Sequence, residues 1–378
     1  VMLLTKAIKP MRIFYAVPAI ATPAPQSALW QANLYMSLRD LGHDVVMFEF
    51  DYSGISTNLD ITCPAQAEYI RQHKPVLSEE LLRQVRLAHA AKPINLFFSY
   101  FYSAHVDAAV IREIGCMGIT TINWYCNASY QFHLVQDIAP AYHYCLVPEK
   151  FRLGDYRGVG ANPIYCQEAA NPSVYKPYDL PIEYEATFVG QRYGDRPYYI
   201  SKLIAAGIDA LVWGPHWHDP VPEVPLWRKV VRRLKQVGGG TPDWVSARVP
   251  GERCGPPLSD DEYVKMYSRS KISLGFSNVA YIPRHGEPIK QVRLRDFEAT
   301  MSGAFYMVQH FDELTDFFEP DREIVCFSDA AELVDKARFY LAHDAERERI
   351  RMAGMERARS EHTWHKRFEM VFREIGLT

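Results

Sequence analysis

The chain has 378 residues, and its 42 Lys and Arg against 45 Asp and Glu leave a formal net charge of −3 at neutral pH. Hydrophobic residues make up 48% and charged residues 23%, which is typical of a globular protein and excludes disordered, collagen-like and coiled-coil chains. The balanced charge argues against a basic nucleic-acid module, and the length predicts about two domains.

The first half of the chain alternates between strands and helices. Arg12–Val17 is a predicted strand, Ser27–Leu41 is a predicted helix that Gly42 ends, and Val45–Phe50 is the next strand. Further strands are predicted at Asn95–Tyr100, Thr120–Trp124 and Tyr144–Val147, with a helix near Asp107–Ile114. Residues 1–175 therefore predict a parallel-sheet, Rossmann-like α/β domain.

A Pro-rich joint at residues 171–179 separates this region from a second α/β region, predicted over residues 176–360. Its strands are predicted at Thr187–Gly190, Ala210–Trp213, Ile272–Phe276, Ala304–Val308 and Glu323–Phe327. Its helices are predicted at Pro197–Ala206, Leu226–Val237, Asp260–Arg269, Ile289–Met301 and Asp312–Phe318, before a mainly helical tail. Ligands of open parallel sheets bind beyond the carboxyl ends of the strands, so we expect the site in a cleft between the two domains.

Cysteine usage and hydropathy bear on the compartment. The seven cysteines include no C-x-x-C pair, which argues against a disulfide framework or a zinc ribbon and favours a reducing cytoplasm. No apolar run reaches about 18 residues, so we expect no membrane-spanning helix.

The most informative segment is Gln291–Gly303, QVRLRDFEATMSG, which a predicted strand follows. Its helix places Arg295 and Glu298 three residues apart on one face, and Gly303 allows a close approach to the backbone. A carboxylate at Glu298 could accept both hydroxyls of a ribose. The alternative is an exposed Arg–Glu pair worth about 0.2–0.5 kcal/mol.

A second candidate is the loop between the strand ending at Gly190 and the helix that opens near Pro197. Helix N-termini with glycine-bearing loops bind phosphate through free N–H groups and the helix dipole. Gly190, Arg192 and Arg196 are therefore candidate donor-binding residues, with Arg196 directed at a diphosphate. The alternative is an ordinary strand-to-helix turn with a surface arginine.

These blocks resemble the CgeB-like (spore-maturation) glycosyltransferases, members of the GT-B superfamily, over about residues 258–370. The resemblance rests on Arg295-Asp296-Phe297-Glu298-Ala299, Gly303, Phe317-Phe318-Glu319-Pro320, Glu323-Ile324 and Tyr340-Leu341-Ala342-His343. It implies two Rossmann-like domains, a nucleotide diphosphate sugar as donor without a further cofactor, and Glu298 on the donor ribose. It also implies that Trp213-Gly214 lines the cleft, and that residues 361–378 pack back on the first domain through a helix carrying Trp364, Phe368 and Phe372.

One position departs from related enzymes. Many retaining GT-B enzymes carry a second glutamate eight residues before the ribose-binding one, but Lys290 occupies that place here. Lys290 could instead face the diphosphate, or be a solvated residue of the first helical turn. The stereochemistry of transfer stays open.

Asp260-Asp261-Glu262 resembles a D-x-E metal motif, but Ser259 with Glu262 three residues later predicts a helix cap. We therefore expect no metal site there. GT-B enzymes usually replace the metal with helix dipoles and basic side chains.

In the first domain, His105 follows a predicted strand and precedes a helix, where it could serve as a general base or hold the donor sugar. Asp107 is the second candidate catalytic residue. The alternatives are a capping or loop histidine and a helix N-cap aspartate.

The predicted helix Leu226–Val237 gathers Arg228, Arg232 and Arg233 on one face. These residues are either a solvated basic face or a binding surface for an anionic acceptor. Candidate acceptors are a phosphorylated glycan, a lipid-linked sugar and a nucleic acid.

The sequence thus predicts a metal-independent glycosyltransferase that uses a nucleotide diphosphate sugar. Two alternatives are a nucleotide-sugar epimerase or hydrolase of the same architecture, and a non-catalytic structural protein that keeps the fold.

Overall fold

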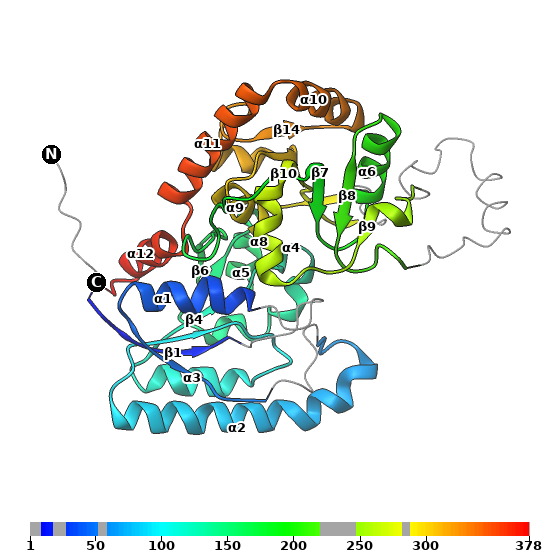
Figure 1. Ribbon diagram of the computed structural model, residues 1–378. Coiled ribbons are helices and arrows are strands. Elements are labelled where there is room, and N and C mark those ends of the chain that lie inside the picture. The colour runs from blue at the N-terminus through cyan, green and yellow to red at the C-terminus, as the bar shows by residue number, and fades with distance from the viewer. Residues whose placement is uncertain (1–8, 18–27, 52–58, 220–246, 282–287, 378) are drawn as a thin grey trace. The chain divides into compact units, whose positions relative to one another are not determined.

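The computed structural model describes residues 9–17, 28–51, 59–219, 247–281 and 288–377 (Figure 1). The chain forms two compact units. The first unit comprises Val1–Lys176, Gln291–Met301 and Arg357–Thr378, and the second comprises Pro177–Lys290 and Ser302–Glu356. The chain first passes from one unit to the other within the predicted Pro-rich joint. It returns to the first unit for the short segment that carries Glu298.

The first unit is built on a six-stranded, wholly parallel sheet with the order β2-β1-β3-β4-β5-β6. The strands are β1 (Arg12–Ala16), β2 (Asp44–Met47), β3 (Leu96–Ser99), β4 (Thr120–Trp124), β5 (Tyr144–Val147) and β6 (Pro163–Tyr165). Every residue of β3 is buried, as expected for a parallel strand covered on both faces. The sequence pattern did not predict β6.

Helices surround this sheet. They are a π-helical turn (Gln31–Tyr35) that continues into α1 (Met36–Asp40), α2 (Ala67–Ala91), α3 (Ala108–Cys116), α4 (Ala128–Gln131), α5 (Leu153–Gly158), α9 (Leu294–Met301) and α12 (Trp364–Glu374). Helix α2 was not predicted from the sequence. It has 25 residues, includes Pro75 and packs against α3 (Figure 1).

The C-terminal helix α12 packs into the core of the first unit. Trp364, Phe368 and Phe372 are buried and repeat every four residues along one face. The Trp364 ring lies 5.1 Å from Trp124 on β4, and Phe368 lies 5.7 Å from Phe98 on β3. The Thr363 side chain caps the helix by accepting the Lys366 N–H.

The second unit has its own six-stranded parallel sheet, with the order β14-β13-β10-β7-β8-β9. The strands are β7 (Tyr184–Val189), β8 (Ala210–Trp213), β9 (Cys254–Gly255), β10 (Ser270–Gly275), β13 (Tyr306–Gln309) and β14 (Val325–Phe327). A separate antiparallel pair joins β11 (Asn278–Tyr281) to β12 (Pro288–Lys290).

The helices of the second unit are α6 (Arg196–Ala205), α8 (Asp260–Arg269), α10 (Ala330–Ala342) and most of α11 (Asp344–Glu361), with a 3₁₀ segment at Asp312–Asp316. The Asp329 carboxylate caps α10 by accepting the N–H groups of Ala331 and Glu332. Parallel sheets flanked by helices in both units confirm the predicted α/β class.

One predicted boundary was wrong. The helix expected from residue 289 begins only at Leu294, because Pro288–Lys290 pairs with β11 as a strand. Lys290 is therefore a strand residue and not part of a first helical turn. The predicted helix Leu226–Val237 lies outside the described residues.

Candidate functional site

Helix α9 carries Arg295 and Glu298. The helix begins at Leu294, and the Asp296 carboxylate reaches back to accept the Arg293 N–H at 2.8 Å, which satisfies a backbone donor at the helix start. Glu298 is only 3% exposed, whereas Arg295 is half-buried. The interpretation of the two residues as an exposed ion pair is therefore wrong for Glu298, whose carboxylate lies inside the first unit.

Aromatic contacts hold α9 within the first unit. The Phe297 ring lies 5.3 Å from the His362 ring, and the Arg367 guanidinium lies 5.8 Å from the centre of the Phe297 ring. Gly303, just beyond the helix, has a φ of +76°, which a glycine adopts without strain. Arg351 fills the space beside it and donates to the Gly303 carbonyl at 3.0 Å. The group that approaches the backbone closely at Gly303 is therefore the protein's own Arg351 side chain.

The loop after β7 is joined to the loop after β8 by backbone and indole hydrogen bonds. The Gly190 N–H donates to the Trp213 carbonyl at 2.7 Å, and the Trp217 Nε1 donates to the Gly190 carbonyl at 2.7 Å. Gly214 has a φ of +141°, and a Cβ at that position would lie 2.4 Å from the Gly190 oxygen. Glycine is therefore required at residue 214 both for its backbone angle and for this close approach.

Trp213, the last residue of β8, is packed by its neighbours. Its ring lies 5.2 Å from the ring of Tyr184. A Cβ on Gly255 would lie 2.1 Å from the Trp213 ring, so glycine on β9 makes room for the indole. The Trp213-Gly214 corner is thus built by close packing around both residues.

The three candidate donor-binding cations of the second unit each bond a backbone carbonyl. Arg192 Nη1 lies 3.1 Å from the Asp219 oxygen, and Lys290 Nζ lies 3.2 Å from the His310 oxygen. Arg196 Nη1 donates to the Gln191 oxygen at 2.7 Å, and its guanidinium lies 3.9 Å from the centre of the Tyr193 ring. Arg196 is only 2% exposed, so it is not the surface arginine of the alternative interpretation.

His105 lies between β3 and α3 in the first unit and is 2% exposed. Its Nδ1 accepts the Tyr102 N–H at 3.3 Å, and the two rings are 4.6 Å apart. A neutral imidazole whose Nδ1 accepts a hydrogen bond carries its proton on Nε2. This contact places the proton of a neutral His105 ring on Nε2, an arrangement that favours hydrogen-bond donation over proton removal.

Asp107 occupies the N-cap position of α3, but no cap hydrogen bond from its side chain is present. Its carboxylate pairs with Lys74 of α2 at 3.2 Å and is about half exposed, while its N–H donates to Ser78 Oγ. These contacts join α3 to α2.

Two comparisons with known proteins show what the chain is similar to. Residues 199–373 match a family model described as Glycosyl transferase-like. Among solved structures, Anabaena Alr3699/HepE in complex with UDP-glucose is similar with a TM-score of 0.60 at 10% identity, covering 97% of this chain and 100% of that one. Residues 199–373 are thus glycosyl transferase-like, and the chain has the GT-B fold.

Two further solved structures are similar to this chain. Sucrose-phosphate synthase (tll1590) from Thermosynechococcus elongatus has a TM-score of 0.56 at 14% identity, covering 97% of this chain and 99% of that one. AviGT4, a glycosyltransferase involved in avilamycin A biosynthesis, has a TM-score of 0.53 at 14% identity, covering 97% and 96% of the two chains. No curated protein matches the sequence.

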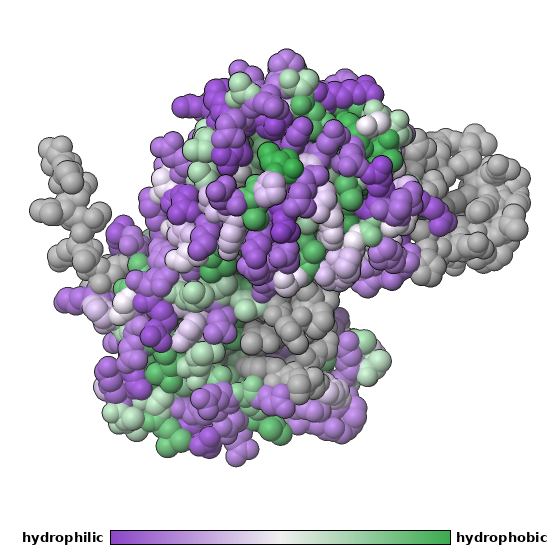
Figure 2. Space-filling view, viewed as in Figure 1, coloured by the Kyte–Doolittle hydropathy of each residue, from purple (hydrophilic) through white to green (hydrophobic). Residues whose placement is uncertain are grey.

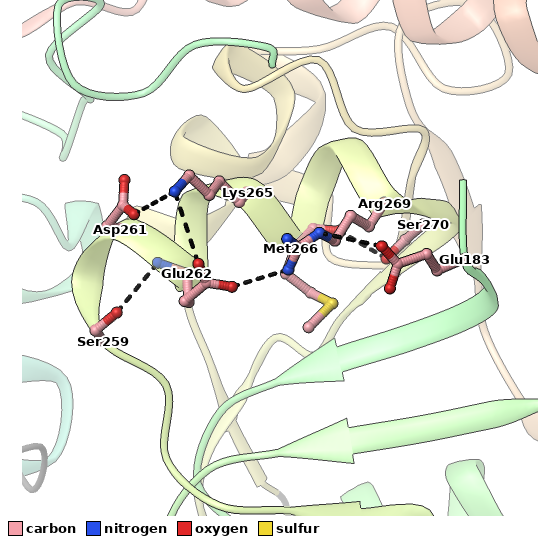
Figure 3. A network of polar contacts seen from close by, with 8 residues as sticks. All are labelled: Glu183, Ser259, Asp261, Glu262, Lys265, Met266, Arg269 and Ser270. Carbon is pink, nitrogen blue, oxygen red and sulfur yellow. Dashed lines mark hydrogen bonds and ion pairs between the residues drawn. The ribbon is translucent and has the colours of Figure 1, made fainter. Parts of the chain in front are cut away.

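The acidic residues 260–262 lie in the first turn of α8, which the Ser259 side chain caps (Figure 3). Ser259 Oγ accepts the Glu262 N–H at 3.3 Å, which confirms the predicted cap. Asp261 pairs with Lys265 at 2.5 Å, and Glu262 pairs with Arg269 at 2.8 Å (Figure 3). Among the described residues, no group of three or more His, Cys, Asp and Glu could hold a metal ion.

Two further expectations concern a membrane-spanning helix and the basic segment at residues 226–237. None of the helices that the structure describes is long and apolar enough to span a membrane, and the visible face of the second unit is mostly hydrophilic (Figure 2). Arg228, Arg232 and Arg233, the predicted acceptor-binding residues, lie outside the described residues.

Sequence reasoning missed a buried cluster at the carboxyl ends of three neighbouring strands of the first unit. Cys126 follows β4, Glu149 follows β5 and Glu168 follows β6, and each is no more than 5% exposed. The sequence signal is an acidic residue shortly after a strand, since Glu149 comes two positions after β5 and Glu168 three positions after β6. Strand β6 has only three residues and was not predicted.

Proposed function

We propose that this glycosyltransferase moves a sugar from a nucleotide diphosphate sugar to an acceptor hydroxyl without a metal ion. The observation that carries the proposal is the buried Glu298 in the R-x-F-E-A helix, together with the match of residues 199–373 to a glycosyl transferase-like family. We further place the chain in the CgeB-like branch, because the sequence blocks quoted above follow one another in that family's order.

In this proposal Glu298 accepts hydrogen bonds from the two ribose hydroxyls of the donor. A carboxylate has two oxygens and accepts only, so it suits a pair of neighbouring hydroxyl donors. Burial favours this role because a charge-assisted hydrogen bond is stronger where little water competes. Arg295, on the same helix, adds positive charge for the donor.

Arg192 and Lys290 stabilise the diphosphate. A guanidinium has five N–H donors and an ammonium three, so the hydrogen bonds to backbone carbonyls hold these side chains in place without using all their donors. Arg196 has a different role, since its guanidinium is buried against Tyr193 and bonds the loop's own carbonyl. It fixes the 190–196 loop, whose N–H groups lead into the N-terminus of α6.

The reaction breaks the bond between the anomeric carbon and the diphosphate oxygen and forms a bond from the same carbon to the acceptor oxygen. The nucleoside diphosphate leaves with the bonding electron pair, and the acceptor hydroxyl passes its proton to water or to an oxygen of the leaving diphosphate. Arginine, lysine and backbone N–H groups stabilise the charge that develops on the leaving group. His105 donates from Nε2 to a substrate oxygen. Asp107, at the N-terminus of α3, holds that helix against α2 through its ion pair with Lys74.

The acceptor is an anion that the basic face of residues 226–237 attracts through Arg228, Arg232 and Arg233. Reversing all three to Glu is expected to raise the acceptor KM and leave donor affinity unchanged, and an unchanged KM would contradict this role. For a nucleic acid acceptor, log affinity falls with log salt by about 0.9 per phosphate neutralised on duplex DNA. We place the enzyme in the cytoplasm, as its seven free cysteines suggest.

The test is a thermal-shift screen against UDP-, GDP-, dTDP- and CMP-sugars, beginning with UDP-glucose. A donor that binds the native state raises the melting temperature, and the Glu298→Gln variant should lose most of that rise. Product analysis with and without acceptor then separates transfer from hydrolysis or epimerisation. Nucleotide binding without turnover under all conditions would indicate a non-catalytic protein, and an equal response of Glu298→Gln would exclude the assigned donor site.

A further inference from the structure

Asn278, the first residue of β11, connects the loop at residues 190–196 to the hairpin of β11 and β12 within the second unit. Its side-chain Nδ2 donates to Asp195 Oδ2 at 2.6 Å. Its backbone carbonyl accepts the Tyr193 hydroxyl at 2.9 Å. One residue of the hairpin thus bonds two residues of the loop, once through its side chain and once through its backbone.

The Asp195 carboxylate has a second amide partner at the end of β13. Gln309 is only 4% exposed, and its Nε2 lies 3.4 Å from Asp195 Oδ2 and 3.2 Å from the Tyr199 hydroxyl. An ionised carboxylate only accepts hydrogen bonds, so the two amides face the same oxygen with their N–H groups. The end of the loop is therefore held by β11 and β13 together.

The residues that hold Asp195 also border Lys290 on β12. Lys290 is the partner of Asn278 in the antiparallel pairing of β11 with β12. Residues directly opposite on antiparallel strands project to one face, with Cβ atoms about 4.5–5.5 Å apart. Lys290 Nζ donates to the carbonyl of His310, the residue after Gln309, at 3.2 Å. Lys290 is thus a neighbour of Asn278 across the hairpin and reaches the chain next to Gln309.

This arrangement connects two cations that come from separate segments. Arg192 lies three residues before Asp195 in the loop, and Lys290 lies on the hairpin that Asn278 joins to that loop. Two cations bind one diphosphate best when their separation is fixed before the ligand arrives, because ordering them during binding costs free energy. The bond between Asn278 and Asp195 supplies such a fixed connection.

We propose that Asn278 is a positioning residue that couples the loop at residues 190–196 to the hairpin, so that Arg192 and Lys290 act on the same diphosphate. This inference rests on the proposed function of those two cations. Removing the Asn278 amide leaves both cations in the chain but breaks the side-chain bond between their segments. The variant should therefore lose the affinity that the second phosphate contributes and keep the affinity for the rest of the nucleotide.

The experiment measures the affinities of UDP and UMP by calorimetry, since the two ligands differ by one phosphate. The wild type should prefer UDP by about tenfold or more, because a second phosphate adds charge-assisted hydrogen bonds. Asn278→Ala and Lys290→Met should each reduce this preference by about tenfold. The matched control is Asn162→Ala, which removes an exposed side chain that donates to the His143 carbonyl of the first unit, and it should keep the wild-type preference.

The ratio of the two affinities separates positioning from a merely structural role. Loss of stability alone lowers the melting temperature and leaves the preference for UDP over UMP unchanged. An equal preference in the wild type and in Asn278→Ala, both folded by circular dichroism, would therefore overturn the proposal.

An exchange of the two partners gives a second test that keeps the size of both side chains. Asn278→Asp alone sets two carboxylates against each other and should reduce the preference for UDP by at least as much as Asn278→Ala. Adding Asp195→Asn restores an amide that faces a carboxylate, and the double variant should regain most of the wild-type preference. A double variant that is no better than Asn278→Asp would contradict the coupling.

Failure of this inference differs from failure of the proposed function. A wild type that binds UDP no better than UMP would refute the assigned diphosphate site, and the role of Asn278 with it. A preference that Lys290→Met reduces but Asn278→Ala and Asn278→Asp leave intact would refute the positioning role alone.

Discussion

Both units contain a six-stranded parallel sheet whose strand order reverses beside the first strand, but they differ in the chemistry at the carboxyl edges of their sheets. In each sheet, the first strand in chain order is an internal strand. The second strand pairs with one side of it, and a later strand pairs with the other side, so that β1 borders β3 and β7 borders β10. Such reversals in strand order are where open α/β sheets bind ligands. The first unit places tyrosines, a thiol and carboxyls at this edge, whereas the second places glycines and cations there. The topology determines where a site can form, and the residues just after the strands determine its chemistry.

The units also control charge by different means. In the first, burial raises the pKa values of Tyr100, Tyr102 and Cys126, so these groups stay neutral. In the second, Arg192, Arg196 and Lys290 are charged and bond backbone carbonyls. This difference supports the proposal that the cations of the second unit bind the diphosphate of the donor.

The largest effect is expected from crowding the second unit's loops. Gly214→Ala would place a Cβ against the Gly190 oxygen at a positive φ, so we expect a loss of about 2–4 kcal/mol in the free energy of unfolding. Gly207→Ala is the control, because its φ is +84° but its Cβ would meet no atom within 4 Å. Its cost should be about 1–2 kcal/mol. Equal losses in chemical denaturation would show that the approach to Gly190 does not matter.

The next effect concerns Glu298 of the first unit, to which we assign the ribose of the sugar donor. Glu298→Gln should weaken UDP binding by about 1.5–3 kcal/mol, because a charge-assisted hydrogen bond becomes a neutral one. Glu369→Gln, on the partly exposed face of α12, is the matched control and should bind UDP like the wild type. Calorimetry measures both, and equal affinities for wild type and Glu298→Gln would contradict the assignment.

A smaller effect compares one substitution in both units. Trp217→Phe removes the hydrogen bond to the Gly190 carbonyl and should weaken donor binding by about 1 kcal/mol through disorder of the loop. Trp364→Phe, in the first unit's core, should lower stability through lost packing and leave donor affinity unchanged. The role of the indole in positioning the loop is refuted if Trp217→Phe binds UDP as tightly as the wild type.

The smallest effect is expected from chelation. Asp261 and Glu262 pair with Lys265 and Arg269, so donor transfer should proceed at the same rate in excess EDTA. Activity that disappears in chelator and returns with Mg²⁺ or Mn²⁺ would show that cations and helix dipoles alone do not stabilise the leaving diphosphate.

The sequence determined those features that depend on local pattern. The four-residue spacing of Trp364, Phe368 and Phe372 predicted a one-sided helix, and Ser259 three residues before Glu262 predicted a cap. Strands such as Thr120–Trp124 and Ala210–Trp213 were predicted at their observed bounds, because buried parallel strands are short, apolar and bounded by turns. The order of these elements was enough for the α/β class.

Only the tertiary structure decided features that depend on partners distant in the chain. Pairing with β11 makes Pro288–Lys290 a strand, and packing against α3 stabilises α2 despite its internal Pro75. The grouping of residues 291–301 with the first unit and the burial of Arg196 against Tyr193 likewise have no local signature. Hydrophobic periodicity reports which face of a segment is buried, but it does not report what that face is buried against, and the pKa of a buried carboxyl depends on those neighbours.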